Sequence, residues 1–272
     1  MKKLCIYHGN CADGFTAAWS VYKALGDDVE FYKGVYGEPV PDVTDREVII
    51  VDFSYKRDVL TEMAKKAKSI LILDHHKTAK ADIQPLIDDS TVQGIFDMNR
   101  SGAMIAWEYF NPNERAPMLV QYAQDRDLWR FELEGSREYS AAVFSYDYTF
   151  ENWDMLARRP AKELINEGKV LERKHFKDIE ELLKLCKTRM VIGGFDVPVA
   201  NMPHQFASDA CHIMAKGEPF AATYYINEQG RTIFSLRSSE DGEDVSAIAS
   251  QYGGGGHKHA SGFSIQGQGI TL

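Results

Sequence analysis

Three apolar segments in the first part of the chain each run into an ionisable residue. LCIY is followed by His8, VIIV by Asp52 and ILIL by Asp74. Continuous apolar runs of this length are typical of strands that are buried on both faces of a parallel sheet. Stretches with helical spacing of apolar residues separate them, which indicates repeated strand–helix–strand units. The first half of the chain therefore predicts an α/β fold built on a parallel sheet.

The remaining pattern completes the expected order of elements. In the first half we expect strands at 4–8, 29–32, 47–53 and 69–74 and helices at 14–25, 54–67, 100–110 and 115–129, whereas 137–160 shows no clear pattern. Apolar residues at helical spacing, without a proline, predict one long helix from Ala161 to Thr188. After it we expect a strand at 191–200, a helix at 207–217, a hairpin at 221–238, a helix capped by Asp244 and a final strand.

The change of pattern around the long helix predicts two domains. We expect a parallel-sheet domain at 1–160, a helical linker at 161–190 and a smaller α/β domain at 191–272. A chain of 272 residues is long enough for two ordinary domains, each with its own core.

Composition and charge narrow the function classes. No apolar run approaches the ~20 residues that span a membrane, and MKKLCIYHG is too short an apolar stretch for a signal peptide, so we expect a cytoplasmic protein. The net charge of −9 argues against long duplex nucleic acid as a partner, because phosphate binding normally needs a basic surface. The four cysteines form no CxxC pair and are expected to be reduced thiols.

Ionisable residues gather where the predicted strands end. In open parallel sheets ligands bind outside the carboxyl ends of the strands, and right-handed crossovers bring these ends to one edge. Imidazole with carboxylate suits Mn²⁺, Fe²⁺, Zn²⁺ or Co²⁺, and so many ligands suit two metals bridged by one carboxylate. The candidates are His8, Asp13, Asp52, Asp74, His75, His76, Asp125 and Asp127.

Each candidate also has a purely structural interpretation. Asp and His often cap helices that follow strands, and we expect Asp127 to pair with Arg126 or Arg130 on the surface. His75 and His76 differ from the others, because an exposed histidine pair joined to a strongly apolar strand has no obvious packing role.

Several ordered motifs together resemble the DHH phosphoesterases. They are HGNCADG, VDF, LDHHK and QDRDLWRF in the first half, and FSLRS with DVSAIASQYGGGGHKHASGF in the second. The second set is similar to the DHH-associated C-terminal domain of nanoRNase-like members, and the family also includes RecJ-like exonucleases and manganese-dependent pyrophosphatases. The resemblance covers nearly the whole chain and implies a catalytic metal-binding domain followed by a substrate-binding domain.

The resemblance implies a role for each motif residue. Asp52 resembles the carboxylate that bridges two divalent metals, with Mn²⁺ expected first and Mg²⁺, Co²⁺ or Fe²⁺ as alternatives. Asp74 resembles a residue that orients a histidine, and His76 resembles the histidine that contacts the scissile phosphate and assists the leaving oxygen. The implied metal ligands are His8, Asp13, Asp52, His75 and Asp125.

The glycine-rich segment allows two interpretations. Consecutive glycines let backbone N–H groups approach an anion closely, but such segments are also common as turns after helices. It is not a P-loop, since no Ser or Thr directly follows the lysine. The resemblance implies a substrate-binding loop, with Arg237, Gly254, Gly255, Gly256, His257 and Lys258 as the expected binding residues.

These expectations favour one function and leave others open. We expect a phosphodiesterase in which a hydroxide held between two metals attacks phosphorus, acting on linear dinucleotides such as pGpG and very short oligonucleotides. Domain closure around the substrate would select its length. The alternatives are a phosphatase for nucleotide bisphosphates such as pAp, a single-strand exonuclease, and a catalytically inactive nucleotide sensor. A monomer or homodimer is expected.

The first motif departs from the family pattern. Members usually carry two aspartates in a D-x-D-like arrangement, whereas here Asn10 or Cys11 stands near the position of the first, and Asp13 is the second. Asn can ligate a metal through its amide oxygen and Cys through its thiolate. Cys11 can equally pack as a small apolar residue.

Overall fold

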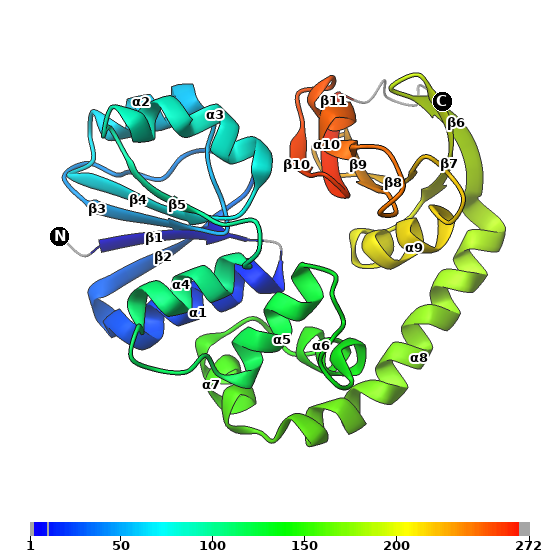
Figure 1. The fold of residues 1–272 in the computed structure, drawn as a ribbon, viewed down its shortest axis with the longest axis horizontal. Helices are drawn as coiled ribbons and strands as arrows, with labels where there is room; N and C mark the ends of the chain where they lie inside the picture. The colour runs from blue at the N-terminus through cyan, green and yellow to red at the C-terminus, as the bar shows by residue number, and fades with distance from the viewer. Residues whose placement is uncertain (1–2, 10, 267–272) are drawn as a thin grey trace. The chain divides into compact units, whose positions relative to one another are not determined.

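The chain forms two compact units, Met1–Glu172 and Arg173–Leu272, and the division falls within one long helix. A computed structural model describes residues 3–9 and 11–266 (Figure 1). No helix among these residues is long and apolar enough to cross a membrane.

The first unit contains a five-stranded sheet in which every neighbouring pair of strands is parallel. The strand order is β2-β1-β3-β4-β5, with β1 (Lys3–His8), β2 (Val29–Gly34), β3 (Glu47–Val51), β4 (Ser69–Asp74) and β5 (Gln93–Phe96). The helices between the strands are α1 (Ala12–Leu25), α2 (Arg57–Ala64) and α3 (Lys77–Asp88), and a short 3₁₀ turn (Gly26–Asp28) precedes β2.

Alternate residues of the strands face two different cores. Cys5, Tyr7, Ile49, Val51 and Leu73 pack on one face, against α1 and α4 (Gly102–Phe110). Leu4, Ile6, Val48, Ile50, Ile70 and Ile72 pack on the other face, against α2 and α3. Figure 1 shows these helices on opposite sides of the sheet. Because both faces are covered, the strands read as continuous apolar runs, and each fully buried Ile or Leu contributes about 1.5–3 kcal/mol.

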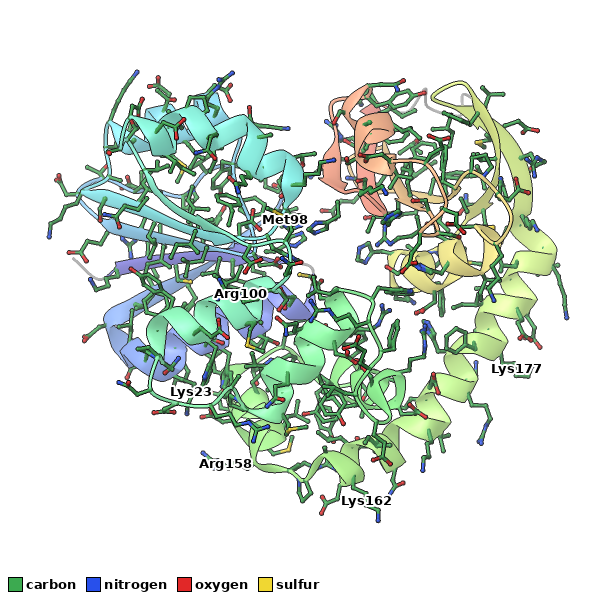
Figure 2. All side chains as sticks on the ribbon, viewed as in Figure 1. Lys23, Met98, Arg100, Arg158, Lys162 and Lys177 are labelled. Carbon is green, nitrogen blue, oxygen red and sulfur yellow. The ribbon has the colours of Figure 1, made fainter. Side chains whose placement is uncertain are left out.

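Four further helices complete the first unit and lead out of it: α5 (Met118–Asp127), α6 (Ser136–Phe144), α7 (Phe150–Arg158) and α8 (Ala161–Cys186). The indole N–H of Trp153 donates to Thr16 Oγ1 at 2.9 Å and fixes α7 to α1. Lys23 of α1 also donates to Asp154 of α7, at 3.1 Å. Lys162 and Lys177 are exposed side chains of α8 (Figure 2). Gly168 lets α8 approach α6, because a β-carbon there would lie 1.7 Å from the carbonyl oxygen of Glu138.

The second unit contains a mixed six-stranded sheet in the order β10-β11-β9-β8-β7-β6, in which only β7 and β8 are parallel. Its strands are β6 (Lys187–Ile192), β7 (Phe195–Asn201), β8 (Ala221–Ile226), β9 (Arg231–Arg237), β10 (Gly255–His257) and β11 (Ala260–Gln266). Helix α9 (Ala207–Met214), after a 3₁₀ turn at His204–Phe206, packs with α8 on one face, and α10 (Val245–Ser250) packs on the other.

The α/β architecture and most expected elements are confirmed, but α3 and β5 were not expected, and three further segments differ from the expectation. The predicted strand at 191–200 is two antiparallel strands, because Gly193 and Gly194 have φ of +59° and +88° and form a tight turn between β6 and β7. The segment 137–160 contains α6 and α7. The strand predicted at 47–53 ends at Val51, because Asp52 leaves the extended conformation.

Candidate metal centre

Asp52 takes a left-handed backbone conformation directly after β3. Its φ is +52°, which is uncommon for residues other than glycine, and its N–H donates to the carbonyl oxygen of Leu73 at 2.9 Å. Asp and Asn tolerate this conformation better than other residues with a β-carbon. Such outliers persist where surrounding structure holds them, often at functional sites. The turn places a fully buried carboxylate at the carboxyl edge of the sheet.

Two glycines, Gly14 of the first motif and Gly102, allow close packing around this edge. A β-carbon on Gly102, the first residue of α4, would lie 2.4 Å from the β-carbon of Asp52. A β-carbon on Gly14 in α1 would lie 2.4 Å from the carbonyl oxygen of His8. Both helices therefore begin against the strand ends, and the N–H of Ala103 in α4 donates to Asp13 Oδ2 at 3.2 Å.

Asp52 and His75 form the centre of the cluster. His75 Nε2 lies 3.1 Å from Asp52 Oδ1 and 3.4 Å from Asp127 Oδ2. Asp52 also lies near the first motif, with its Oδ2 3.6 Å from His8 Nδ1. Both Asp52 and His75 are at most 2% exposed, so the electrostatic interaction between them is only weakly screened by solvent.

Three groups of donor atoms in this unit are close enough to hold a metal ion. Within each group the donor atoms all lie within 4.8 Å of one another; the groups are Asp52–Asp74–His75–His76, His8–Cys11–Asp52 and Asp13–His75–Asp127. Asp52 belongs to two of them, and so does His75. A carboxylate shared between adjoining groups is suited to bridging two metals.

Burial and mutual charge shift the pKa values of these residues strongly. Burial alone would lower the pKa of His75, but the hydrogen bond with Asp52 and the charges of Asp127, Asp52 and Asp13 outweigh it and raise the pKa to about 10. Burial also opposes ionisation of Asp52, yet His75 and His8 hold its pKa well below the usual range. Burial, then the charges of Asp127 and Asp52, raise the pKa of Asp13 well above its ordinary value.

The donor set fits divalent cations. Asp13 Oδ1 and Asp74 Oδ2 are buried, and within residues 3–9 and 11–266 no hydrogen-bond donor reaches either oxygen. A buried carboxylate oxygen without a partner is costly, and a cation would satisfy it. Imidazole and carboxylate ligands together suit first-row divalent metals.

Asp74 lies beside the two histidines and holds both. Its Oδ1 accepts from the N–H of His75 at 2.8 Å and lies 2.7 Å from His76 Nδ1. Burial would lower the pKa of His76, but Asp74 outweighs it and raises that pKa. Asp74 therefore fixes the ring of His76 through Nδ1, which directs Nε2 away from the carboxylate.

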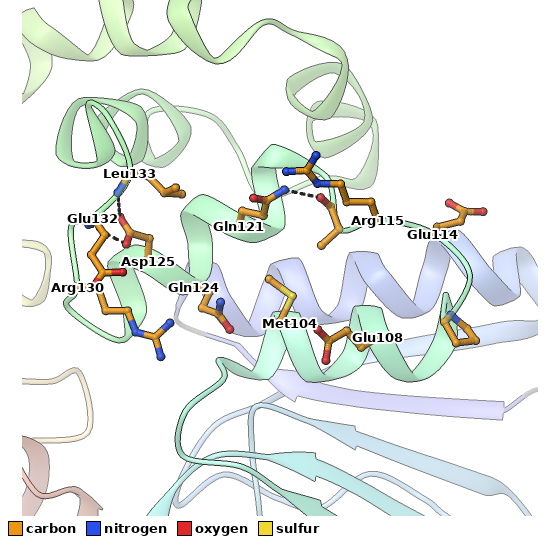
Figure 3. A pocket seen from close by; sticks show the side chains of 12 residues that line it. Met104, Glu108, Glu114, Arg115, Gln121, Gln124, Asp125, Arg130, Glu132 and Leu133 are labelled. Atoms are coloured by element: carbon orange, nitrogen blue, oxygen red, sulfur yellow. Dashed lines mark hydrogen bonds between the residues drawn. The ribbon is translucent and has the colours of Figure 1, made fainter.

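Asp127, and not Asp125, lies beside the other residues of the cluster. Asp125 is also buried, but its carboxylate accepts from the backbone N–H groups of Glu132 and Leu133 at 3.0 and 3.3 Å (Figure 3). The two aspartates lie about 200° apart around α5, since each residue of a helix advances ~100°. Asp125 therefore holds the turn in which Trp129 and Phe131 take positive φ values.

The carboxylate of Asp127 forms an ion pair with the buried His75, which the expected surface pairing did not include, because the end of α5 directs this residue toward the strand ends. The positive charge of Arg126 also acts on this carboxylate, as expected. Arg130 donates instead to the carbonyl oxygen of Asn99 at 2.7 Å. A hollow of about 700 Å³ lined by Asp125 and Arg130, shown in Figure 3, lies beside this turn.

Cys11 faces the cluster, whereas Asn10 lies outside the described residues. Cys11 Sγ accepts from the N–H of Gly14 at 3.1 Å, and it lies 3.2 Å from His8 Nδ1 and 3.1 Å from Asp52 Oδ2. The thiol is thus part of the donor set and does not pack simply as an apolar side chain.

The expected substrate-binding residues lie in the second unit. His257 of β10 is opposite Ala260 of β11, which is opposite Arg237 of β9, so His257 and Arg237 share one face of the sheet. The Arg237 guanidinium donates to Ser208 Oγ at 2.8 Å. A β-carbon on Gly254 would lie 2.1 Å from the carbonyl oxygen of Gly262, so packing between strands accounts for this glycine. Gly255 is the first residue of β10, and Lys258 follows the strand in the turn to β11.

Sequence reasoning missed two residues beside the centre. Asp127 is among the candidates from the sequence, but its contact with His75 is not expected there. Gly102 in RSGAM and Tyr36 had no local signal. Tyr36 is 56% exposed, and its ring centroid lies 5.9 Å from that of His8 and 4.6 Å from that of Phe53.

Comparison with known protein sequences finds two relatives that match nearly the whole chain. No protein-family model matches the chain. An uncharacterized protein of Acanthamoeba polyphaga mimivirus is 29% identical over 96% of this chain and 67% of its own length. Oligoribonuclease NrnB of Bacillus subtilis is 24% identical over 96% of this chain and 72% of its own length.

A solved structure shares the fold. It is an exopolyphosphatase-related protein of Bacteroides fragilis, with a TM-score of 0.51 and 13% identity over 98% of this chain and 88% of its own. These comparisons show a fold shared with that structure, and two sequence relatives that match over nearly the whole chain, one of them named an oligoribonuclease.

Proposed function

We propose that this protein is a metal-dependent phosphodiesterase that hydrolyses linear dinucleotides such as pGpG, and very short oligonucleotides, to mononucleotides. Two divalent cations, Mn²⁺ first among them, would be held at the edge of the parallel sheet by His8, Asp13, Asp52, His75 and Asp127. The proposal replaces Asp125 with Asp127 in the ligand set, since Asp127 is the one beside His75.

The observation that carries the proposal is the position of Asp52. Its buried carboxylate belongs to two adjoining donor groups and sits on a strained turn that packing against Gly102 supports. Bound divalent cations lower the pKa of water and neutralise charge that develops on phosphorus. Strained backbone that surrounding packing holds in place is often found at functional sites, which supports a role for this carboxylate.

The neighbouring residues supply the rest of the chemistry. With Nδ1 held by Asp74, His76 can donate a proton from Nε2 to the leaving ribose oxygen or to a phosphate oxygen. The carboxylate of Asp74 raises the pKa of His76, which favours the protonated ring. Arg237, His257, Lys258 and the backbone of Gly254–Gly256 would bind the nucleotide phosphate in the second unit.

Short RNA is the favoured substrate class. The oligoribonuclease named among the relatives acts, by its name, on short RNA, and the net charge of −9 disfavours a long polyanion. The competing functions are hydrolysis of pAp, degradation of long single strands, and nucleotide sensing without catalysis.

One assay separates these functions. The full chain is incubated with Mn²⁺ and end-labelled 2-mer, 5-mer and 30-mer RNA or with pAp, and Asp52→Asn serves as the inactive control. We expect the 2-mer to be cleaved at the highest kcat/KM. Equal turnover of the 30-mer would establish an exonuclease, and preference for pAp a phosphatase. Nucleotide binding without hydrolysis in any divalent metal would establish a sensor.

A further inference from the structure

Cys11 occupies a position where a helix normally begins with an oxygen-bearing side chain. It is the N-cap of α1, with φ −137° and ψ 156°, and its Sγ accepts from the N–H of Gly14. Ser, Thr, Asp and Asn are the preferred residues there, because their oxygens accept this bond more strongly than sulfur does. The cap alone thus gives no reason for cysteine, and its other contacts are informative.

The thiol lies among ligands of the metal centre at coordination spacing. Cys11 Sγ is 3.1 Å from Asp52 Oδ2 and 3.2 Å from His8 Nδ1, and these two atoms are 3.6 Å apart. With metal–ligand bonds of ~2.0–2.3 Å, neighbouring donors around one tetrahedral or octahedral ion lie about 2.8–3.8 Å apart. All three separations fall in that range, so a single cation can contact the three atoms.

The surroundings of the thiol favour a nearby cation. Cys11 Sγ lies beside the carboxylate of Asp52, and Asp13 and Asp127 belong to the neighbouring donor group, so the thiol stands in an acidic cluster. A second feature of the centre also calls for a cation: Asp13 is 3% exposed, and its Oδ1 is buried without a donor in the described residues. A divalent ion reverses the local sign of charge and deprotonates a coordinating thiol.

We propose that Cys11 is a thiolate ligand, and that it forms with His8 and Asp52 a mixed sulfur, nitrogen and oxygen site for one of the two metals. A thiolate favours Zn²⁺, Co²⁺ or Fe²⁺ over Mg²⁺ and Mn²⁺. The two positions of the centre thus differ in metal preference, and the softer one adjoins α1. This inference rests on the metal centre of the proposed function, but not on the identity of the substrate.

Cobalt spectroscopy on the metal-free full chain tests the proposal. A thiolate bound to Co²⁺ gives an intense charge-transfer band in the near ultraviolet, which oxygen and nitrogen ligands do not give. We expect this band in the wild type and its loss in Cys11→Ser, whose hydroxyl still caps α1. Cys186→Ser is the matched control, because that thiol is also half-buried and donates to a carbonyl oxygen in α8. It should keep the band.

Metal affinities complete the test. We expect Cys11→Ser to weaken Co²⁺ binding by more than about tenfold. Substitution of residues that only support the metal ligands already weakens metal binding by about 10- to 100-fold. Cys11→Asp should bind metal without the band and shift the preference toward Mn²⁺. If the wild type and Cys11→Ser bind Co²⁺ with equal affinity and the wild type shows no band, Cys11 is not a ligand, while the metal centre itself still stands. No metal binding by the wild type would overturn both.

Discussion

Gly102 packs directly against Asp52, and a β-carbon on Gly102 would lie 2.4 Å from the β-carbon of Asp52 and 2.9 Å from its carboxyl carbon. Neither residue can move away easily, because Gly102 is the first, buried residue of α4 and Asp52 lies in a left-handed turn. The start of α4 therefore determines where the carboxylate of Asp52 can stand.

Gly102→Ala should displace Asp52 and weaken the metal centre. Alanine normally stabilises a helix relative to glycine, but here the overlap should cost about 1–3 kcal/mol in the free energy of unfolding. We also expect Mn²⁺ affinity to fall more than about tenfold. Calorimetric metal titration and thermal melting measure both effects. Unchanged metal affinity would show that the contact does not position Asp52.

Asp52→Asn and Asp52→Ala should separate ligation from backbone strain. Both substitutions remove the carboxylate, so hydrolysis of every substrate should be lost. Asparagine tolerates the left-handed conformation, whereas alanine should lose about 1 kcal/mol of additional stability. Urea denaturation of the two variants measures this difference. If both unfold at the same urea concentration, the positive φ of Asp52 carries no cost.

Asp125 and Asp127 should respond differently to the same substitution. Asp127→Asn removes a carboxylate beside His75, so metal affinity should fall while the melting temperature changes little. Asp125→Asn weakens the two bonds to the backbone of Glu132 and Leu133, so stability should fall by about 1–3 kcal/mol. Each variant is the control for the other. Lost metal binding in Asp125→Asn at an unchanged melting temperature would restore Asp125 as the ligand.

His75 should make metal binding depend on pH. Its pKa in the metal-free fold is about 10, against an ordinary value of 6.5, so a cation must displace its proton at neutral pH. Metal binding should release protons, and the affinity should rise with pH. Titration in buffers of different ionisation enthalpy measures the release. His75→Gln should release fewer protons, and an equal number would contradict the assignment.

The same shift has the opposite consequence for stability without metal. A pKa raised on folding stabilises the fold fully below the unfolded value of 6.5, and this contribution is lost as pH rises through about 10. Urea denaturation of metal-free wild type and His75→Gln across this range measures it. Equal pH dependence in the two proteins would show that His75 is not the group concerned.

Tyr36 should provide a stacking surface for a base of the substrate. Its ring is 56% exposed and lies against Phe53 beside His8. Stacking on an aromatic ring is worth about 1–3 kcal/mol per base, so Tyr36→Ala should raise KM by about 5- to 150-fold. Tyr36→Phe should retain the wild-type KM. An abasic dinucleotide is the control substrate, and an equal effect of Tyr36→Ala on it would exclude stacking.

Local sequence was enough to predict the frame of the centre. The apolar runs before His8, Asp52 and Asp74 define strands buried on both faces, and such strands with helices between them form a parallel sheet whose carboxyl ends lie along one edge. The convergence of these residues follows from chain connectivity. Their immediate surroundings follow from contacts between segments far apart in the sequence, which a local pattern does not specify.

Asp125 and Asp127 illustrate that limit. A sequence pattern gives their separation along the helix, but the rotation of α5 about its axis decides which carboxylate faces His75, and packing against α4 and α6 sets that rotation. The role of Cys11 is likewise not specified by the local sequence, because it depends on the distances from the thiol to His8 and Asp52.

The sequence by itself determined the α/β class, the sheet edge and the types of residue that gather there, because hydrophobic periodicity and chain direction are local properties. Only the tertiary structure decided which aspartate completes the centre, why Gly102 must lack a side chain and that a thiol stands among the ligands. Each of these depends on close approach between segments separated by 41 or more residues.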